Sequence, residues 1–266
     1  VISRANGSSA VASGAYRAAE RLHDDRLGRD HDFSNKAGVV HSEIMLPEGA
    51  PERLSDRATL WNEVEGCEKR KDAQLAREVE FSIPRELNQQ QGVALAREFV
   101  EKQFVERGMV ADPNVHWDMG KDGQPKPHAH VMLTMRPITR DGFAKTKGEA
   151  REWNSTESLE GWREQWATHQ NRALERGRHA DRVDHRSFAD RAIDREPTQH
   201  MGPIAHGMEK QGRPSRIGDE NRDTDDRNDA RADDHRRADT LARELAAMGV
   251  PAQAHTNMVF VDTPVE

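Results

Sequence analysis

Two histidines, His128 and His130, stand one residue apart in the segment PKPHAHVMLTM at residues 125–135. Side chains at positions i and i+2 of a β-strand point to the same face, so the two imidazoles would lie side by side. The spacing therefore predicts a strand that presents two possible metal ligands on its polar face. The opposite face would be apolar and suited to the core, with Ala129, Val131, Leu133 and Met135.

A third histidine, His116, lies in an earlier strand candidate at residues 109–119. The pair Asp122-Gly123, between this segment and residues 128–138, is a turn signal that predicts a hairpin. Antiparallel pairing would bring His116 opposite the histidine pair, and three imidazoles can hold a metal ion with positions open for substrate and water. The chain has 13 histidines, however, so the residues alone leave a metal site and an ordinary strand equally open.

Tyr16 is the only tyrosine of the chain. It lies in SSAVASGAYRAAERLHDD, residues 8–25, whose alanines and leading serines predict a helix. A phenol is a weak nucleophile at neutral pH, and it becomes useful where a metal polarises a phosphate ester. Composition alone favours a different interpretation, a core aromatic on an amphipathic helix.

The composition excludes several classes of protein. Charged residues make up 33% of the 266 positions and the mean hydropathy is -0.97, so we expect one modest core. No apolar run approaches the length of a membrane span, and the single Cys67 excludes an internal disulfide and fits a reducing cytoplasm. The net charge is -7, but residues 121–216 carry 18 Lys+Arg against 14 Asp+Glu, so a nucleic-acid partner stays open.

The remaining patterns predict an α+β fold, in which helices flank an antiparallel sheet. We expect strands at residues 37–47 and 76–84. We expect helices in the second part of residues 52–72, at residues 87–108 and at residues 155–177.

Three segments that follow one another in the chain resemble the MobA/MobL relaxases, closest to the N-terminal domain of TraA-type conjugative transfer proteins. They are VISRANGSSAVASGAYRAAERL, AREVEFSIPREL and NVHWDMGKDGQPKPHAHVMLTMR, and the similarity runs from residue 1 to about residue 215. These relaxases are HUH endonucleases, named for a His-hydrophobic-His motif that here is His128-Ala129-His130. The resemblance implies an HUH relaxase-like fold. It also implies a metal-dependent, site-specific single-stranded DNA nickase and strand transferase that starts plasmid mobilisation.

Carried over to this chain, the resemblance implies that Tyr16 is the nucleophile. Its attack would leave a free 3′-OH and a 5′-phosphotyrosyl link, which keeps the bond energy needed to re-ligate the strand. Glu78 and Glu80 match acidic positions of the family's E-x-E-F strand, and would orient a ligand histidine or accept the tyrosine proton. A solvated strand face is the alternative for this pair. One divalent cation, Mg²⁺ or Mn²⁺, would be held by His116, His128 and His130.

The resemblance further implies partners and a location. The substrate would be single-stranded DNA at an origin of transfer, with accessory relaxosome proteins and a type IV secretion coupling protein as partners. The protein would act in the bacterial cytoplasm, without membrane insertion, and would be a candidate for translocation to a recipient cell with the DNA. Trp162 and Trp166 would either stack on bases or pack their helix. The candidate DNA contacts are Arg4, Lys126, Arg136, Lys145 and Lys147.

We expect three parts along the chain. Residues 1–210 would form the relaxase domain, residues 211–232 a charged linker, and residues 233–266 a short αβ tail of unknown role. The tail weakly resembles the C-terminal part of threonine aldolases, but it has no lysine to form a Schiff base. Because relaxases of this family begin upstream of Val1, the N-terminal strand is expected to be truncated.

Three other functions remain open. One is another HUH enzyme, such as a rolling-circle replication initiator or a single-strand transposase. The second is a non-catalytic module that binds single-stranded DNA, whose binding would survive Tyr16→Phe. The third is a three-histidine zinc hydrolase of small molecules, in which Tyr16 would be dispensable. The lone tyrosine distinguishes these functions from a relaxase.

Overall fold

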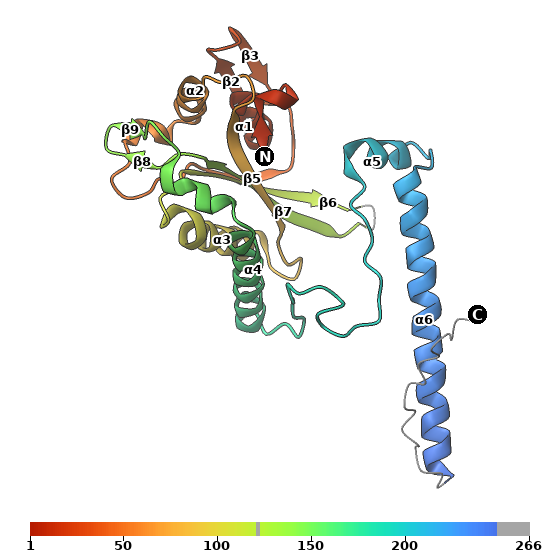
Figure 1. Ribbon diagram of the computed structural model, residues 1–266. Coiled ribbons are helices and arrows are strands. Elements are labelled where there is room, and N and C mark those ends of the chain that lie inside the picture. The colour runs from red at the N-terminus through yellow and green to blue at the C-terminus, as the bar shows by residue number, and fades with distance from the viewer. Residues whose placement is uncertain (121–122, 249–266) are drawn as a thin grey trace, which may run out of the picture. The chain divides into compact units, whose positions relative to one another are not determined.

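A five-stranded antiparallel sheet forms the centre of the first part of the chain (Figure 1). The computed structural model describes residues 1–120 and 123–248. The strand order is β1-β5-β7-β6-β4, so β7, which carries the histidine pair, is the central strand. This confirms the α+β fold with an antiparallel sheet. The strands are β1 Ile2–Ser3, β2 Arg21–Asp24, β3 Arg29–Asp32, β4 Val39–Ser42, β5 Gln74–Ser82, β6 Ala111–Met119, β7 Pro125–Thr134, β8 Ile138–Thr139 and β9 Gly142–Phe143.

Helices cover both faces of this sheet. Helices α1 and α2 pack on one face, in a core that includes Leu75 and Met132. Helices α3 and α4 pack on the other face, against Val131 and Leu133 (Figure 1). The α-helices are α1 Ala10–Ala18, α2 Arg57–Cys67, α3 Gln89–Val100, α4 Thr156–Arg176, α5 Gly202–Lys210 and α6 Arg216–Ala247. A π-helical segment, Glu101–Val105, continues α3, and 3-10 helices form at Arg4–Asn6, Glu52–Ser55 and Gly148–Asn154.

The predicted hairpin is formed by β6 and β7. Its register pairs Ala111 with Leu133 at one end and His116 with His128 near the turn. Ala129, Val131 and Leu133 are fully buried, as the alternation of apolar residues predicts. Burial of this apolar face fixes the register, and the register in turn fixes the histidines on the opposite face.

The helix expected over residues 8–25 ends earlier than the sequence pattern indicates. Helix α1 stops at Ala18, and Ala19 adopts the left-handed conformation with φ 56°. The chain then turns into β2, which pairs with β3 in a hairpin that the sequence analysis did not predict. The prediction was wrong for residues 21–24. An alanine-rich run signals helix propensity but not the position of its C-terminal cap.

A second compact unit begins at Arg186, and it contains α5 and α6. Most of residues 211–232, expected to be a charged linker, lie within α6. Arg216–Glu220 and Arg222–Asp219 are ion pairs at helical spacing, which explains why such a charged sequence forms a helix. The expected strand of the tail lies outside the described residues. The division at residues 210 and 232 stays a prediction.

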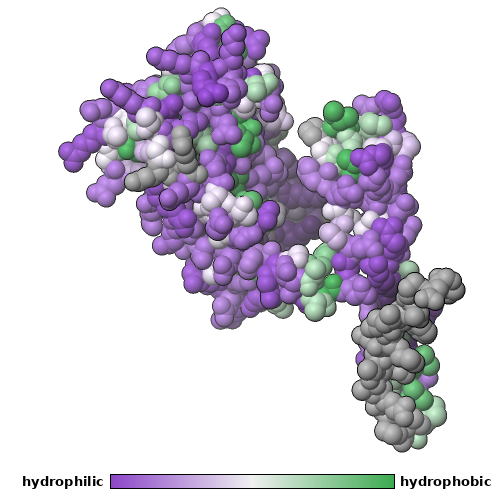
Figure 2. Space-filling model, in the orientation of Figure 1, coloured by the Kyte–Doolittle hydropathy of each residue, from purple (hydrophilic) through white to green (hydrophobic). Residues whose placement is uncertain are grey.

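The surface of the described residues is mostly hydrophilic on the face that Figure 2 shows, with small hydrophobic patches. Within residues 1–120 and 123–248, no helix combines the length and the apolar character that crossing a membrane requires.

Candidate metal centre

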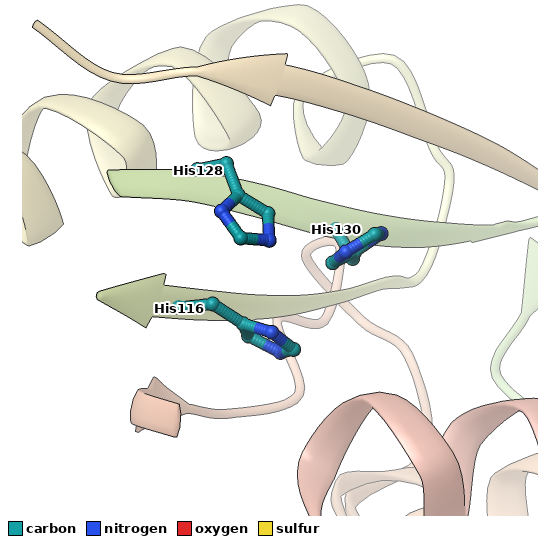
Figure 3. Close-up of side chains that lie close together, drawn as sticks. All are labelled: His116, His128 and His130. Atoms are coloured by element: carbon teal, nitrogen blue, oxygen red, sulfur yellow. The ribbon is translucent and has the colours of Figure 1, made fainter. Parts of the chain in front are cut away.

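The three predicted ligand histidines converge on one face of the sheet (Figure 3). His116 lies directly opposite His128, and His130 follows on the same face of β7. Their ring centroids are 5.0 to 5.2 Å apart, and one ligand nitrogen of each lies within 4.8 Å of the other two. Nitrogens bound at about 2.1 Å to one ion lie at most about 4.2 Å apart, so binding needs only a small closing of the side chains. The three residues fit a metal ion.

Each imidazole donates one hydrogen bond and keeps its other ring nitrogen for a cation. Nε2 of His116 donates to the carbonyl oxygen of Arg17 at 2.9 Å, and Nδ1 of His128 donates to the carbonyl oxygen of Lys126 at 2.9 Å. These acceptors assign the tautomers and fix the ring orientations, as is usual around bound metals.

Glu78 is the hydrogen-bond acceptor of His130. Nδ1 of His130 donates to Oε1 of Glu78 at 3.0 Å, and the guanidinium of Arg17 donates to both carboxylate oxygens at 2.5 Å. Burial alone would raise the pKa of this carboxyl, but the hydrogen bonds from His130 and Arg17 and the Arg17 charge outweigh it and lower the pKa to about 2. Glu78 is therefore ionised at neutral pH and is a weak base. Its position suits orientation of His130 better than proton transfer.

His116 is the most buried of the three ligands, with 2% of its surface exposed. Burial lowers its pKa to about 4, the nearby Lys36 charge acts in the same direction, and the hydrogen bond to Arg17 opposes them. The imidazole is therefore neutral at physiological pH. Neutral imidazole is the form that binds a metal.

Tyr16 lies near the end of α1, next to Arg17, whose carbonyl oxygen accepts the hydrogen bond of His116. Its side chain is 49% exposed, so it is not the core aromatic that composition alone favours. The ring packs edge-on against Phe33, with centroids 5.2 Å apart, and the ammonium of Lys36 lies 4.0 Å from its centre. The helix that carries the lone tyrosine is thus attached to the histidine face.

Glu80 lies opposite His130 on β5, on the same face as Glu78. Its Oε2 is 3.8 Å from Nδ1 of His130, beyond hydrogen-bond distance, and its side chain is 62% exposed. The two glutamates therefore differ in environment. Glu78 is engaged by two partners, whereas Glu80 faces solvent beside the site.

The structure divides the basic residues predicted to contact DNA into two groups. Three of them form ion pairs within the fold. Arg4 pairs with Glu65, and both Arg136 and Lys147 pair with Glu68. These three cations are thus engaged within the fold. The remaining two, Lys126 and Lys145, are exposed.

The two tryptophans of α4 belong to the core. Trp162 and Trp166 are 4% and 8% exposed, and Trp166 packs against Phe81 with centroids 4.3 Å apart. Their burial supports the helix-packing role.

A buried polar network joins α2 to β6. Asp112 is fully buried and accepts hydrogen bonds from the guanidinium of Arg57 at 3.0 Å and from Nε1 of Trp61 at 2.8 Å. Because Asp112 and His116 lie on the same strand and the same face, this network holds the strand that carries the most buried ligand.

Two residues of the site were missed from the sequence. Arg17 holds Glu78 and accepts from His116, and its only signal is that it follows the lone tyrosine. Lys36 lies over the tyrosine ring, but it comes from a polar loop with no periodicity.

Comparison with known proteins matches residues 8–211 to the MobA/MobL family. The chain is 36% identical over 244 residues to the conjugal transfer protein TraA of Agrobacterium fabrum, covering 80% of this chain and 22% of TraA. It is 36% identical over 248 residues to the mobilization protein MobL of Acidithiobacillus ferridurans, covering 83% of this chain and 64% of MobL. A solved structure described as "Molecular Basis of Vancomycin Resistance Transfer in Staphylococcus aureus" superposes with a TM-score of 0.65 at 36% identity. The match covers 70% of this chain and 95% of that one. The chain thus spans about a fifth of TraA and less than two thirds of MobL.

Proposed function

The chain belongs to the MobA/MobL family, and we propose that it contains a relaxase domain that nicks single-stranded DNA at an origin of transfer. In this proposal the nick is metal-dependent and site-specific, and it leaves a 5′-phosphotyrosyl link to Tyr16 that starts conjugative mobilisation. The relatives named for conjugal transfer and mobilisation support the general kind of activity.

One observation carries the proposal. Three imidazoles converge within 4.8 Å, and one of them is hydrogen-bonded to the residue that follows the only tyrosine of the chain. A core aromatic would be buried, whereas Tyr16 is half exposed and precedes the residue that His116 contacts. A metal site joined to an exposed phenol is a combination suited to transesterification of a phosphodiester.

His116, His128 and His130 would hold the cation. Because DNA phosphate oxygens are hard ligands, we propose Mg²⁺ or Mn²⁺ as the ion, although three imidazoles would also accept zinc. When bound, the ion supplies positive charge to the non-bridging oxygens of the scissile phosphate. Glu78 keeps His130 oriented by accepting its Nδ1 hydrogen, and the Arg17 carbonyl does the same for His116.

The phenolic oxygen of Tyr16 attacks the phosphorus in line with the 3′ oxygen of the preceding nucleotide. The O–P bond to tyrosine forms, the bond from phosphorus to the 3′ oxygen breaks, and that oxygen takes up a proton. The phenol proton passes to a base, for which Glu80 is the better candidate because both oxygens of Glu78 are engaged by Arg17. Since the link conserves the phosphodiester bond energy, the reverse reaction re-ligates the strand.

We propose that exposed lysines, Lys126 and Lys145, contact DNA phosphates. Arg4, Arg136 and Lys147 would have to leave their present ion pairs to do so, and we assign them to the fold first. Accessory relaxosome proteins, a type IV secretion coupling protein and action in the bacterial cytoplasm remain part of the proposal through the family.

The test is incubation of the protein with single-stranded oligonucleotides that cover candidate transfer origins, with Mn²⁺ or with a chelator. The expected product is a covalent adduct on Tyr16, detected by denaturing gel and mass spectrometry, that forms only with metal. The variants Tyr16→Phe and His130→Ala should abolish it. His23→Ala, an exposed histidine of the β2–β3 hairpin, is the matched control and should not.

Binding of the oligonucleotides without any adduct would contradict the relaxase proposal and favour a non-catalytic DNA-binding module. An adduct that persists in Tyr16→Phe would refute the assignment of the nucleophile.

A further inference from the structure

Lys36 makes two contacts with the lone tyrosine. Its Nζ lies 4.0 Å from the centre of the Tyr16 ring, and it donates a hydrogen bond to the Tyr16 carbonyl oxygen at 3.1 Å. The Lys36 ammonium group thus contacts both the ring and the backbone of Tyr16. A cation over an aromatic face is attracted by the ring quadrupole, and more strongly when the pair is partly desolvated.

The charge of Lys36 is not neutralised by an ion pair. Among residues 1–120 and 123–248, no carboxylate lies within ion-pair distance of its Nζ, although Asp118 is near enough to raise the pKa of the ammonium. Burial has the larger effect and lowers that pKa, and the Arg17 charge acts in the same direction. The neighbouring Arg17, by contrast, is committed to Glu78. Unlike Arg17, Lys36 therefore carries a charge near Tyr16 that no ion pair of the described residues neutralises.

Lys36 also reaches the histidine side of the site. It donates to the carbonyl oxygen of Tyr16, and His116 donates to the carbonyl oxygen of the next residue, Arg17. Tyr16 and His116 therefore both lie near this one charge. At an effective dielectric constant of about 20, a charge at such distances acts appreciably on groups that become negative.

We propose that Lys36 is a positioning residue for the Tyr16 nucleophile, which holds the phenol ring at the histidine face and places a positive charge beside it during attack. This inference rests on the proposed function. As the O–P bond forms, the phenol loses its proton to a base and negative charge passes from the oxygen to the phosphoryl group. A fixed ammonium that faces the ring stabilises the phenolate, and no solvent has to reorganise to do so.

The charge and the shape of Lys36 can be separated by substitution. Lys36→Met keeps the length of the side chain and removes the charge, whereas Lys36→Arg keeps the charge and the ability to lie over a ring. Lys102→Met, at an exposed lysine of the π-helical segment Glu101–Val105, is the matched control. The melting temperature of each variant reports whether it is folded.

The experiment measures the single-turnover rate of adduct formation with saturating oligonucleotide and Mn²⁺. For Lys36→Met we expect a decrease of about tenfold. Loss of a direct oxyanion donor costs on the order of a hundredfold or more, and Nζ faces the ring and not the oxygen. Lys36→Arg should recover most of the rate, and Lys102→Met should leave it unchanged. Affinity for the same oligonucleotide, measured in a Tyr16→Phe background, should not change.

Two results would overturn the inference. One is an unchanged rate in Lys36→Met. The other is a loss confined to affinity, with a weaker salt dependence, which would make Lys36 a contact to a DNA phosphate.

A second readout does not depend on activity. Because Tyr16 is the only tyrosine, incorporation of 3-fluorotyrosine labels it alone, and its ¹⁹F signal should shift and sharpen in Lys36→Met but not in Lys102→Met. If the wild-type protein forms no adduct, the proposed function fails, and this signal still decides whether Lys36 holds the ring. An unaltered signal in Lys36→Met would refute the contact itself.

Discussion

Replacing Glu78 by glutamine should weaken both the fold and the metal centre. Glutamine keeps the size of the side chain but removes the negative charge that lies 2.5 Å from the Arg17 guanidinium and 3.0 Å from His130. The pKa of this carboxyl is lowered from 4.5 to about 2 in the folded protein. A depression of this size corresponds to at most about 3 kcal/mol of unfolding free energy at neutral pH. Because glutamine still accepts hydrogen bonds, we expect a loss of about 1–3 kcal/mol.

The pH dependence follows from the direction of this pKa shift. Since the folded pKa lies below the unfolded one, the carboxylate stabilises the fold fully above about pH 4.5. That contribution is lost as the pH falls toward 2. The difference in stability between the wild type and Glu78→Gln should therefore be constant from pH 6 to 8 and shrink below about pH 4.5.

Urea denaturation of the metal-free proteins, followed by tryptophan fluorescence at several pH values, measures this difference. Glu63→Gln is the control, because Glu63 pairs with Arg53 at the surface, where loss of an ion pair costs at most about 1 kcal/mol. Titration with Mn²⁺ should show a further loss of about 10- to 100-fold in affinity for Glu78→Gln alone, since His130 loses its charged acceptor. The reasoning is refuted if Glu78→Gln resembles Glu63→Gln, or if its stability deficit grows below pH 4.5.

Three further outcomes follow from the same structure. Asp112→Ala should lower the unfolding free energy by about 3–5 kcal/mol in urea denaturation, because it removes the buried carboxylate that pairs with Arg57 and accepts from Trp61, and leaves Arg57 only Glu20 as an ion-pair partner among the described residues; a loss below 1 kcal/mol would contradict this. Gly14→Ala should lower the melting temperature, because a Cβ there would lie 2.7 Å from Cδ1 of the fully buried Trp61. Gly161→Ala in α4, where a Cβ would meet nothing within 4 Å, should be neutral or stabilising by up to about 1 kcal/mol. Mn²⁺ at about 100 times its dissociation constant should stabilise the wild type by about 2.7 kcal/mol in calorimetry, and a chelator should reverse this; no shift with metal would argue against the histidine site.

The histidine face was predictable because its determinants are local. Period-two alternation and the Asp122-Gly123 turn signal predict the hairpin, although Asp122 lies outside the described residues, and burial of Ala129, Val131 and Leu133 leaves a single register that sets His116 opposite His128. The helix expected at residues 155–177 was likewise predictable, because its start depends on one capping side chain, Ser155, and the next turn.

The partners that orient these ligands were not predictable in the same way. Glu78 meets His130 through the pairing of β5 with β7, which joins residues 52 positions apart. The i, i+2 spacing showed that Glu78 and Glu80 share a face, but it could not show that Arg17 would engage only Glu78. That distinction depends on where α1 packs, and no local pattern encodes it.

The position of α1 depends on tertiary contacts that the helical periodicity of its sequence does not reveal. Gly14 lets the helix approach the indole of Trp61, and the left-handed Ala19 ends the helix shortly after Tyr16. Because the helix ends at Ala18, residues 21–24 are left to pair with residues 29–32 in the β2–β3 hairpin.

Arg17 joins the histidine cluster and the helix that carries Tyr16 into one unit. Its carbonyl oxygen accepts from His116 and its guanidinium holds Glu78, which in turn orients His130. The helix that carries Tyr16 is thus hydrogen-bonded directly to His116 on β6, and through Glu78 to His130 on β7. A ligand that orders the His116 and His130 side chains should therefore also order the C-terminal end of α1. By linkage, a contact that orders α1 should favour the ordered histidines. Arg17 thus connects two of the histidines to α1, through its carbonyl oxygen and through Glu78, while Lys36 contacts the Tyr16 ring on the same helix.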